Sequence, residues 1–159
     1  MEYEGYLTRE EILYKVENAF PFVERPAEND LYVYDKSDGM RSIISSGISE
    51  FVEPELPYEG VIILYDEFST ISQKTVKWLF PSMLRILLKE RDLSGNLHWC
   101  IPAYFDHTNF SDPNSAYNFS WLSKRQLSVL NCVLEYISEK YGNSISYAQE
   151  KLMEIEKKI

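Results

Sequence analysis

The chain has 159 residues, of which 45% are hydrophobic and 14% aromatic, so it is long enough for a sizeable core and too apolar for an intrinsically disordered chain. Its net charge of −9 excludes the basic footprint that nucleic-acid binding requires. Two cysteines, Cys100 and Cys132, are too few for a disulfide framework, and no apolar run approaches the length of a membrane span.

The N-terminal segment MEYEGYLTREE is acidic and lacks the basic and apolar regions of a signal peptide, so we expect a soluble, cytoplasmic protein. Thr8 and Glu11 have the spacing of a capping box, and apolar residues follow at helical intervals. This pattern predicts a helix over residues 9–20. Residues 21–30 are then predicted to form a connector. Residues 31–34 have strand-like types, but four residues do not distinguish a strand from an extended loop.

Asp38 or Ser37 can cap a short helix over residues 39–46, and the glycine that follows suits its C-terminal end. Prolines and a glycine in residues 51–60 predict a loop. The apolar run at 61–65 is consistent with either a short buried strand or the beginning of a helix, because five apolar residues reveal no periodicity.

The longest strongly patterned stretch is SQKTVKWLFPSMLRILLKER, residues 72–91. Its lysines and arginines fall on one face of a helix, and the opposite face is apolar: Val76, Leu79, Phe80, Met83, Leu84 and Leu87. Pro81 lies in the middle and removes the hydrogen bond to the carbonyl of Lys77. The stretch therefore predicts a kinked helix, or two short helices that share an apolar face, at the centre of the core.

Residues 92–122 form the longest unpatterned segment, with seven aromatic residues and two prolines. We expect a loop that folds back over the helices, because so many aromatic side chains rarely stay open to water. Two further capping boxes begin at Ser123 and Ser146. The first opens a helix that Gly142 closes, and the second opens a last helix with a thin apolar stripe, free to fray or to dock on a partner.

Together these elements predict a mainly α fold. We expect one compact domain over residues 1–159, with about five helices, an aromatic-rich loop and one or two short strands. The alternative is an α+β fold, in which residues 61–65 pair with residues 31–34.

The charge is distributed unevenly along the chain. Residues 1–73 carry 16 acidic and 5 basic side chains, whereas residues 74–159 carry 9 acidic and 11 basic ones. Between Arg41 and Lys74 there is no lysine or arginine, and six carboxylates accumulate: Glu50, Glu53, Glu55, Glu59, Asp66 and Glu67. Such a field accelerates encounter with a basic protein and repels DNA, which makes the six candidate partner-binding residues. The alternative is a solvated acidic surface that serves solubility.

Trp78 is a further candidate for partner binding. On a helical wheel it lies with Lys74, Arg85 and Lys89, away from the apolar face. An exposed tryptophan among cations is typical of an interface hot spot. The alternative is that the kink at Pro81 turns Trp78 inward, or that the aromatic loop covers it.

His98, Cys100 and His107, with Asp106 beside them, form the one cluster that resembles a metal site. Their spacing matches no standard zinc pattern, and a fourth ligand has to come from elsewhere, with Cys132 as a candidate. The same residues contain the groups of a Cys–His nucleophile pair. The alternative is a set of packed or hydrogen-bonded loop residues. No motif for a phosphate, a nucleophile elbow or a zinc protease is present, so the sequence indicates no cofactor.

Two stretches carry a resemblance to a family. Residues 77–84, KWLFPSML, are followed by residues 119–129, FSWLSKRQLSV. This arrangement resembles a family of small uncharacterised bacterial proteins that pair an aromatic-x-L-P-x-x-L helix with a later F-x-x-L-T/S-x-x-Q-x-x-V helix. The resemblance spans residues 71–141 and departs from the pattern at Phe80, where the family has leucine. It implies a largely helical, cytosolic bacterial protein and transfers no activity. In character, though not in motif, the chain also resembles small acidic immunity proteins.

We therefore expect an acidic protein-binding module, of the immunity or antitoxin type, that blocks a basic toxin such as a nuclease by electrostatic complementarity. One alternative is an enzyme or metal protein that uses the loop with His98, Cys100 and His107. The other is a structural or regulatory homo-oligomer that uses Trp78 and the last helix.

Overall fold

The computed structural model describes residues 1, 5–33, 38–89 and 95–159. The helices in these residues are α1 (Arg9–Ala19), α2 (Gly39–Ile48), α3 (Tyr58–Asp66), α4 (Gln73–Lys89), α5 (Leu97–Asp106), α6 (Lys124–Tyr141) and α7 (Ser146–Lys158), with short 3₁₀ turns η1 (Glu28–Asp30) and η2 (Phe68–Thr70). The only β structure in the described residues is two isolated bridges, Tyr32 with Ile71 and Ser72 with Ser115. The prediction of a mainly α fold is confirmed.

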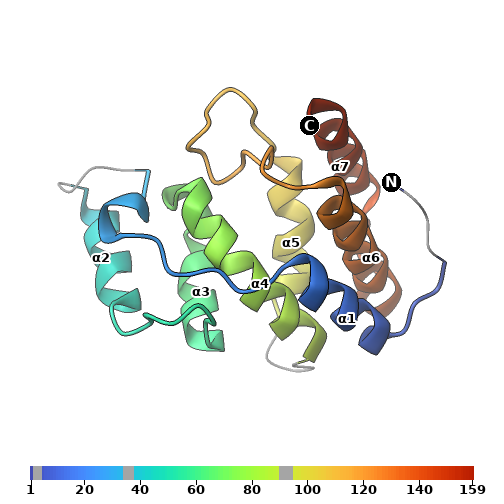
Figure 1. Cartoon of the computed structure of the whole chain (residues 1–159), viewed down its shortest axis with the longest axis horizontal. Coiled ribbons are helices and arrows are strands. Elements are labelled where there is room, and N and C mark those ends of the chain that lie inside the picture. Colours follow the sequence, from blue (N-terminus) through green and yellow to red (C-terminus); the bar gives the residue numbers. More distant parts are fainter. Residues whose placement is uncertain (2–4, 34–37, 90–94) are drawn as a thin grey trace.

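The helices pack side by side around one hydrophobic core. Figure 1 shows α2, α3, α4, α5 and α6 following one another from left to right, with α7 against α5 and α6. Helix α1 packs across α4 and α6, which ties the N-terminal region to the C-terminal half. All seven α-helices contribute buried side chains to the core. Within the described residues, no helix combines the length and apolar character needed to cross a lipid bilayer.

Helix α4 lies at the centre of this arrangement and continues through Pro81 as one helix. Its apolar face is buried as predicted, but most of its other face is buried as well. Only Gln73, Lys74, Lys77, Ile86 and Lys89 of this helix are exposed or half-buried. The reason is that α1, α3 and α5 all contact it, so that two residues predicted on its polar face, Trp78 and Arg85, lie inside the protein.

Of the two alternatives for residues 61–65, the helix is correct, and a further helix lies in the segment that was predicted as an aromatic loop. Residues 61–65 belong to α3 and not to a strand, so they do not pair with residues 31–33. The segment predicted as an aromatic loop contains α5, although the remainder, 107–123, is irregular and does lie over the core through Phe119. Helix α5 contains Pro102 and lacks a polar stripe that alternates with its apolar residues, so the sequence offered no helical period there.

The predicted helix ends have mixed outcomes. Thr8 accepts a hydrogen bond from the Glu11 amide, Asp38 accepts from two amides of α2, and Ser123 and Gln126 form a complete capping box. The box predicted at Ser146 is wrong, because Ser146 is the first residue of α7 and caps no amide.

Helix α2 runs two residues further than predicted, through Gly47. A Cβ atom at Gly47 would lie 3.3 Å from a methyl of Ile63, so this glycine serves the close approach of α2 and α3 rather than the end of the helix.

Candidate functional site

Four of the six candidate carboxylates lie together where α2 leads into α3. We call residues 49–57 the acidic connector; it carries Glu50, Glu53 and Glu55, and Glu59 follows in the first turn of α3. All four side chains are exposed. None of them forms an ion pair with any residue that the structure describes. Their negative charge is therefore directed at solvent.

Asp66 and Glu67 are not part of this group. They lie at the opposite end of α3, seven or more residues beyond Glu59, which corresponds to about 10 Å along a helix axis. The charge of Asp66 acts instead on Cys100 and Tyr104 of α5, where it raises the pKa of both groups in addition to the effect of burial. These two residues therefore lie outside the acidic connector, about two helical turns from Glu59.

Cations from the later helices do pair with acidic residues of the first half, but not with these carboxylates. The Lys74 ammonium lies 3.3 Å from a carboxylate oxygen of Asp30, and that of Lys89 lies 4.0 Å from Glu17. These pairs are on the surface, where ion pairs contribute little to stability. The uneven charge of the sequence is thus partly balanced by these surface pairs, whereas the connector carboxylates form no ion pair with the described residues.

The acidic connector is held against α4 by two hydrogen bonds. The indole Nε1 of Trp78 donates to the carbonyl of Glu53 at 3.1 Å, and the amide of Leu56 donates to Ser82 Oγ at 2.8 Å. Trp78 is fully buried, with the guanidinium of Arg25 5.9 Å from its ring centre. Trp78 is therefore not an exposed hot spot. The connector and Arg25 lie against it, and its hydrogen-bond acceptor comes from the connector rather than from the predicted aromatic loop.

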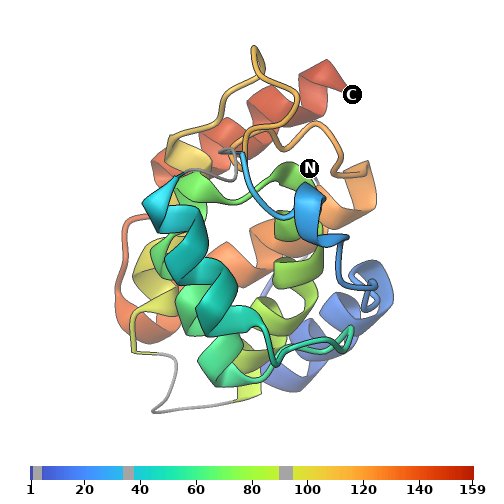
Figure 2. The same cartoon turned by 90° about the vertical axis from the view of Figure 1, so that its left-hand side faces the viewer.

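The outer side of the connector combines acidic and apolar residues. Phe22, from the segment after α1, lines a shallow, open hollow together with Glu53, Pro54, Glu55, Leu56 and Pro57. Phe22 is 38% exposed, and Val52, which precedes Glu53 in the connector, is 59% exposed. The hollow thus combines apolar side chains with the carboxylates of Glu53 and Glu55. Figure 2 views the molecule from the side of α2, where this connector leads into α3.

Phe22 is positioned by Arg85, a residue that the helical wheel placed with the lysines of α4. The Arg85 guanidinium lies 4.1 Å from the centre of the Phe22 ring, and its Nη1 donates to the carbonyls of Phe20 and Pro81, each at 2.8 Å. Burial lowers the pKa of Arg85, while the negative charges of Glu17 and Glu55 raise it. The fold therefore holds a buried cation directly below the acidic surface.

The residues proposed as a metal site do not converge. His98 and Cys100 lie in the first turn of α5 and His107 caps its far end, about 13 Å along the axis. The ring of His98 is bonded through Nδ1 to Asn143 and stacks on Tyr141 at 4.1 Å, while His107 packs edge-on against Tyr117. In residues 1, 5–33, 38–89 and 95–159, no three His, Cys, Asp or Glu side chains gather as metal ligands would. These residues are packed and hydrogen-bonded.

The Cys–His nucleophile pair is equally unsupported by the geometry. Cys100 is two residues from His98 on the same helix, so the two side chains leave α5 in nearly opposite directions. Burial and the charge of Asp66 raise the pKa of the Cys100 thiol, which disfavours the reactive thiolate. The arrangement does not provide an activated cysteine.

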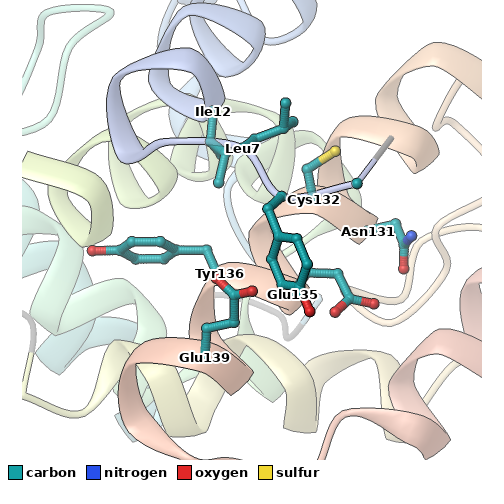
Figure 3. A pocket seen from close by; sticks show the side chains of 9 residues that line it. Leu7, Ile12, Asn131, Cys132, Glu135, Tyr136 and Glu139 are labelled. Carbon is teal, nitrogen blue, oxygen red and sulfur yellow. The ribbon is translucent and has the colours of Figure 1, made fainter. Parts of the chain in front are cut away.

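Cys132 lies in α6, beside a small cavity under the N-terminal segment. Figure 3 shows this cavity between Leu7, Ile12 and Cys132, with Asn131 and Glu135 on one side. Its volume of about 20 Å³ holds a water molecule and nothing larger. Gln149 of α7 donates to both Asn131 and Glu135, so the polar groups there fasten α7 to α6. This cavity is a packing feature.

The surfaces proposed for a homo-oligomer are used within the chain. Trp78 is internal, and the apolar stripe of α7, with Ala148, Leu152 and Ile155, packs against α5 and α6. Comparison with known proteins adds no assignment, since the chain matches no family model, no curated protein and no solved structure. The acidic connector, in contrast, leaves exposed carboxylates beside an apolar hollow.

Proposed function

We propose that the protein is a cytoplasmic protein-binding module of the immunity or antitoxin type, which blocks a basic toxin by covering it with the acidic connector. The observation that carries the proposal is the group of exposed carboxylates Glu50, Glu53, Glu55 and Glu59, which form no ion pair with the described residues. A cationic partner does not have to displace an internal cation in order to reach them, and opposite charge increases its rate of encounter.

The apolar part of the surface supports a protein as the partner. Specific protein interfaces have an apolar centre and a polar rim, and Phe22 supplies exposed apolar area beside Glu53 and Glu55. Burial of such residues slows dissociation, whereas rim charges mainly set the association rate. A nuclease-like toxin suits the charge because an active site that binds phosphates is itself basic. The resemblance to a helical bacterial family remains a prediction beside this argument.

The proposal is tested by capture followed by neutralisation. The protein, immobilised at low salt, is expected to retain a basic protein from a lysate of its own source. Co-expression of the two in a bacterial host should then protect the host from the captured toxin. The triple variant E53K/E55K/E59K should lose this protection and associate more slowly by at least tenfold, since attraction becomes repulsion.

The control is E139K/E150K/E154K, which changes the net charge by the same amount on exposed positions of α6 and α7 and also removes the surface ion pair of Glu154 with Lys151. This variant should protect as well as the wild type. Protection that survives reversal of Glu53, Glu55 and Glu59, or an association rate that does not fall with salt, contradicts the proposal.

A further inference from the structure

A second hollow lies on the inner side of the acidic connector, between the connector and α4. It has a volume of about 230 Å³ and is lined by Glu55, Leu56 and Tyr58 on one side and by Arg85, Ile86 and Lys89 on the other. This is below the size of sites that hold drug-sized ligands, so it suits a smaller molecule. Both apolar and charged groups line it, which is the composition of a specific binding site.

Arg85 lines this hollow and has hydrogen-bond donors that no acceptor among the described residues uses. The side chain is only 8% exposed, and its Nη1 is occupied by the carbonyls of Phe20 and Pro81. Its Nε and Nη2 bond no acceptor among the described residues. Neither atom is among the fully buried polar atoms without a partner in those residues, so both keep some access to solvent. The Nε and Nη2 edge of an arginine carries two parallel N–H groups. Such a pair holds both oxygens of a carboxylate.

Two further features make the hollow positive, one on each of its two sides. Lys89 lines it, and so does the N-terminal end of the nine-residue helix α3, where Pro57 is the N-cap and no side chain caps the first amides. Free amides at a helix N-terminus favour a negative ligand group. The negative groups that face them are Glu55, which lines the hollow, and Glu17, which lies 4.0 Å from Lys89.

We propose that this hollow binds a free α-amino acid with an apolar side chain. Its carboxylate binds the Nε and Nη2 edge of Arg85, its ammonium group binds Glu55, and its side chain lies between Leu56 and Ile86. A ligand with both charges fits a hollow with both charges better than an anion does. The C-terminus of a peptide shares the carboxylate and the apolar side chain but has no ammonium, so Glu55 favours the free amino acid. The inference does not depend on the proposed function, although the two hollows share Glu55, Leu56 and Pro57 of the connector.

The test is a titration with L-leucine to about 10 mM, followed by the methyl resonances of Ile86 and by thermal unfolding. Leucine is expected to shift the Ile86 signals and raise Tm. N-acetyl-L-leucine lacks the ammonium and L-leucinamide lacks the carboxylate, so each should bind at least about tenfold more weakly, since each loses a charge-assisted hydrogen bond. Absence of leucine binding, or tighter binding of the peptide Gly-Gly-Leu than of leucine, overturns the proposal.

Three variants locate the ligand. R85K removes the two parallel N–H groups of the guanidinium and should weaken leucine binding, but it also alters the hydrogen bonds to Phe20 and Pro81. I86F is therefore a second variant, in which a larger side chain at a half-buried position fills the hollow. E55Q should weaken leucine binding and leave N-acetyl-L-leucine unchanged. E50Q, an exposed connector residue outside the hollow, is the matched control and should bind as the wild type.

Two results with these variants overturn the proposal. One is wild-type leucine affinity in I86F. The other is stronger binding of N-acetyl-L-leucine by E55Q, which would identify Glu55 as an internal partner that competes for Arg85.

Discussion

Trp78 and Arg85 show how a polar group becomes part of a core. Each sends its donor to a backbone carbonyl far away in sequence: Trp78 to Glu53 and Arg85 to Phe20. A hydrogen bond to the carbonyl removes most of the penalty for burying the donor. A helical wheel records only which residues of α4 are polar, so it placed both with the exposed lysines. Which carbonyl meets them depends on the path of the connectors, which periodicity does not encode.

The buried hydrogen bond of Trp78 has a measurable consequence. In W78F the carbonyl of Glu53 loses its donor while the aromatic packing is largely kept. The free energy of unfolding should fall by about 1–3 kcal/mol, the usual loss for a buried polar group left unpaired. Chemical denaturation measures this change.

The control is W99F, because Trp99 is 64% exposed and should change the stability by less than about 0.5 kcal/mol. Equal effects of the two substitutions would show that the hydrogen bond to the connector does not contribute.

At the scale of elements, the sequence predicted the helices whose apolar residues repeat regularly and whose first turns are capped. Helices α1 and α6 follow this rule, and α4 was predicted from its apolar period alone. Helix α5 does not, since its ten residues include a proline and aromatic side chains without a polar stripe, and α3 is too short for its period to appear. The candidate site was predicted only as a run of acidic residues, because its hydrogen bonds to Trp78 and Ser82 depend on the path of the connector and not on local pattern.

The two later capping boxes look alike in sequence but differ in the fold. Ser123 accepts from the Gln126 amide and Gln126 bonds back, whereas Ser146 lies inside α7, and Gln149 bonds Asn131 and Glu135 instead. We therefore expect S123A to lower the unfolding free energy by about 1 kcal/mol. For a chain of this size that loss lowers Tm by about 2–4 °C.

S146A is the matched control for this loss. It should leave Tm within about 1 °C of the wild type, because no helix amide loses a partner. A larger effect of S146A than of S123A in calorimetry would contradict the capping geometry.

Across the whole molecule, the helices differ in how many other helices they pack against. Helix α4 contacts α1, α3 and α5, whereas the main helix contact of α2 is with α3 alone. Helix α2 also leaves Met40 and Ile43 exposed, and it lies at one end of the row of helices in Figure 1. Elements with few packing partners open at lower free energy than the rest of a fold.

Native-state hydrogen exchange measures this difference. We expect the amides of α2 to exchange through local opening, with a lower opening free energy than those of α4 and α6, which should exchange only on global unfolding. Protection of α2 equal to that of α4 would show that the two belong to one cooperative unit.

The two hydrogen bonds that fasten the acidic connector to α4 also determine what association costs. Since Glu53 and Leu56 are already fixed to Trp78 and Ser82, this loop loses its freedom when the chain folds and not when a complex forms. A preorganised binding surface retains more of its interaction energy as affinity. Cutting these tethers would therefore shorten the residence time of a bound partner even if every carboxylate stayed in place.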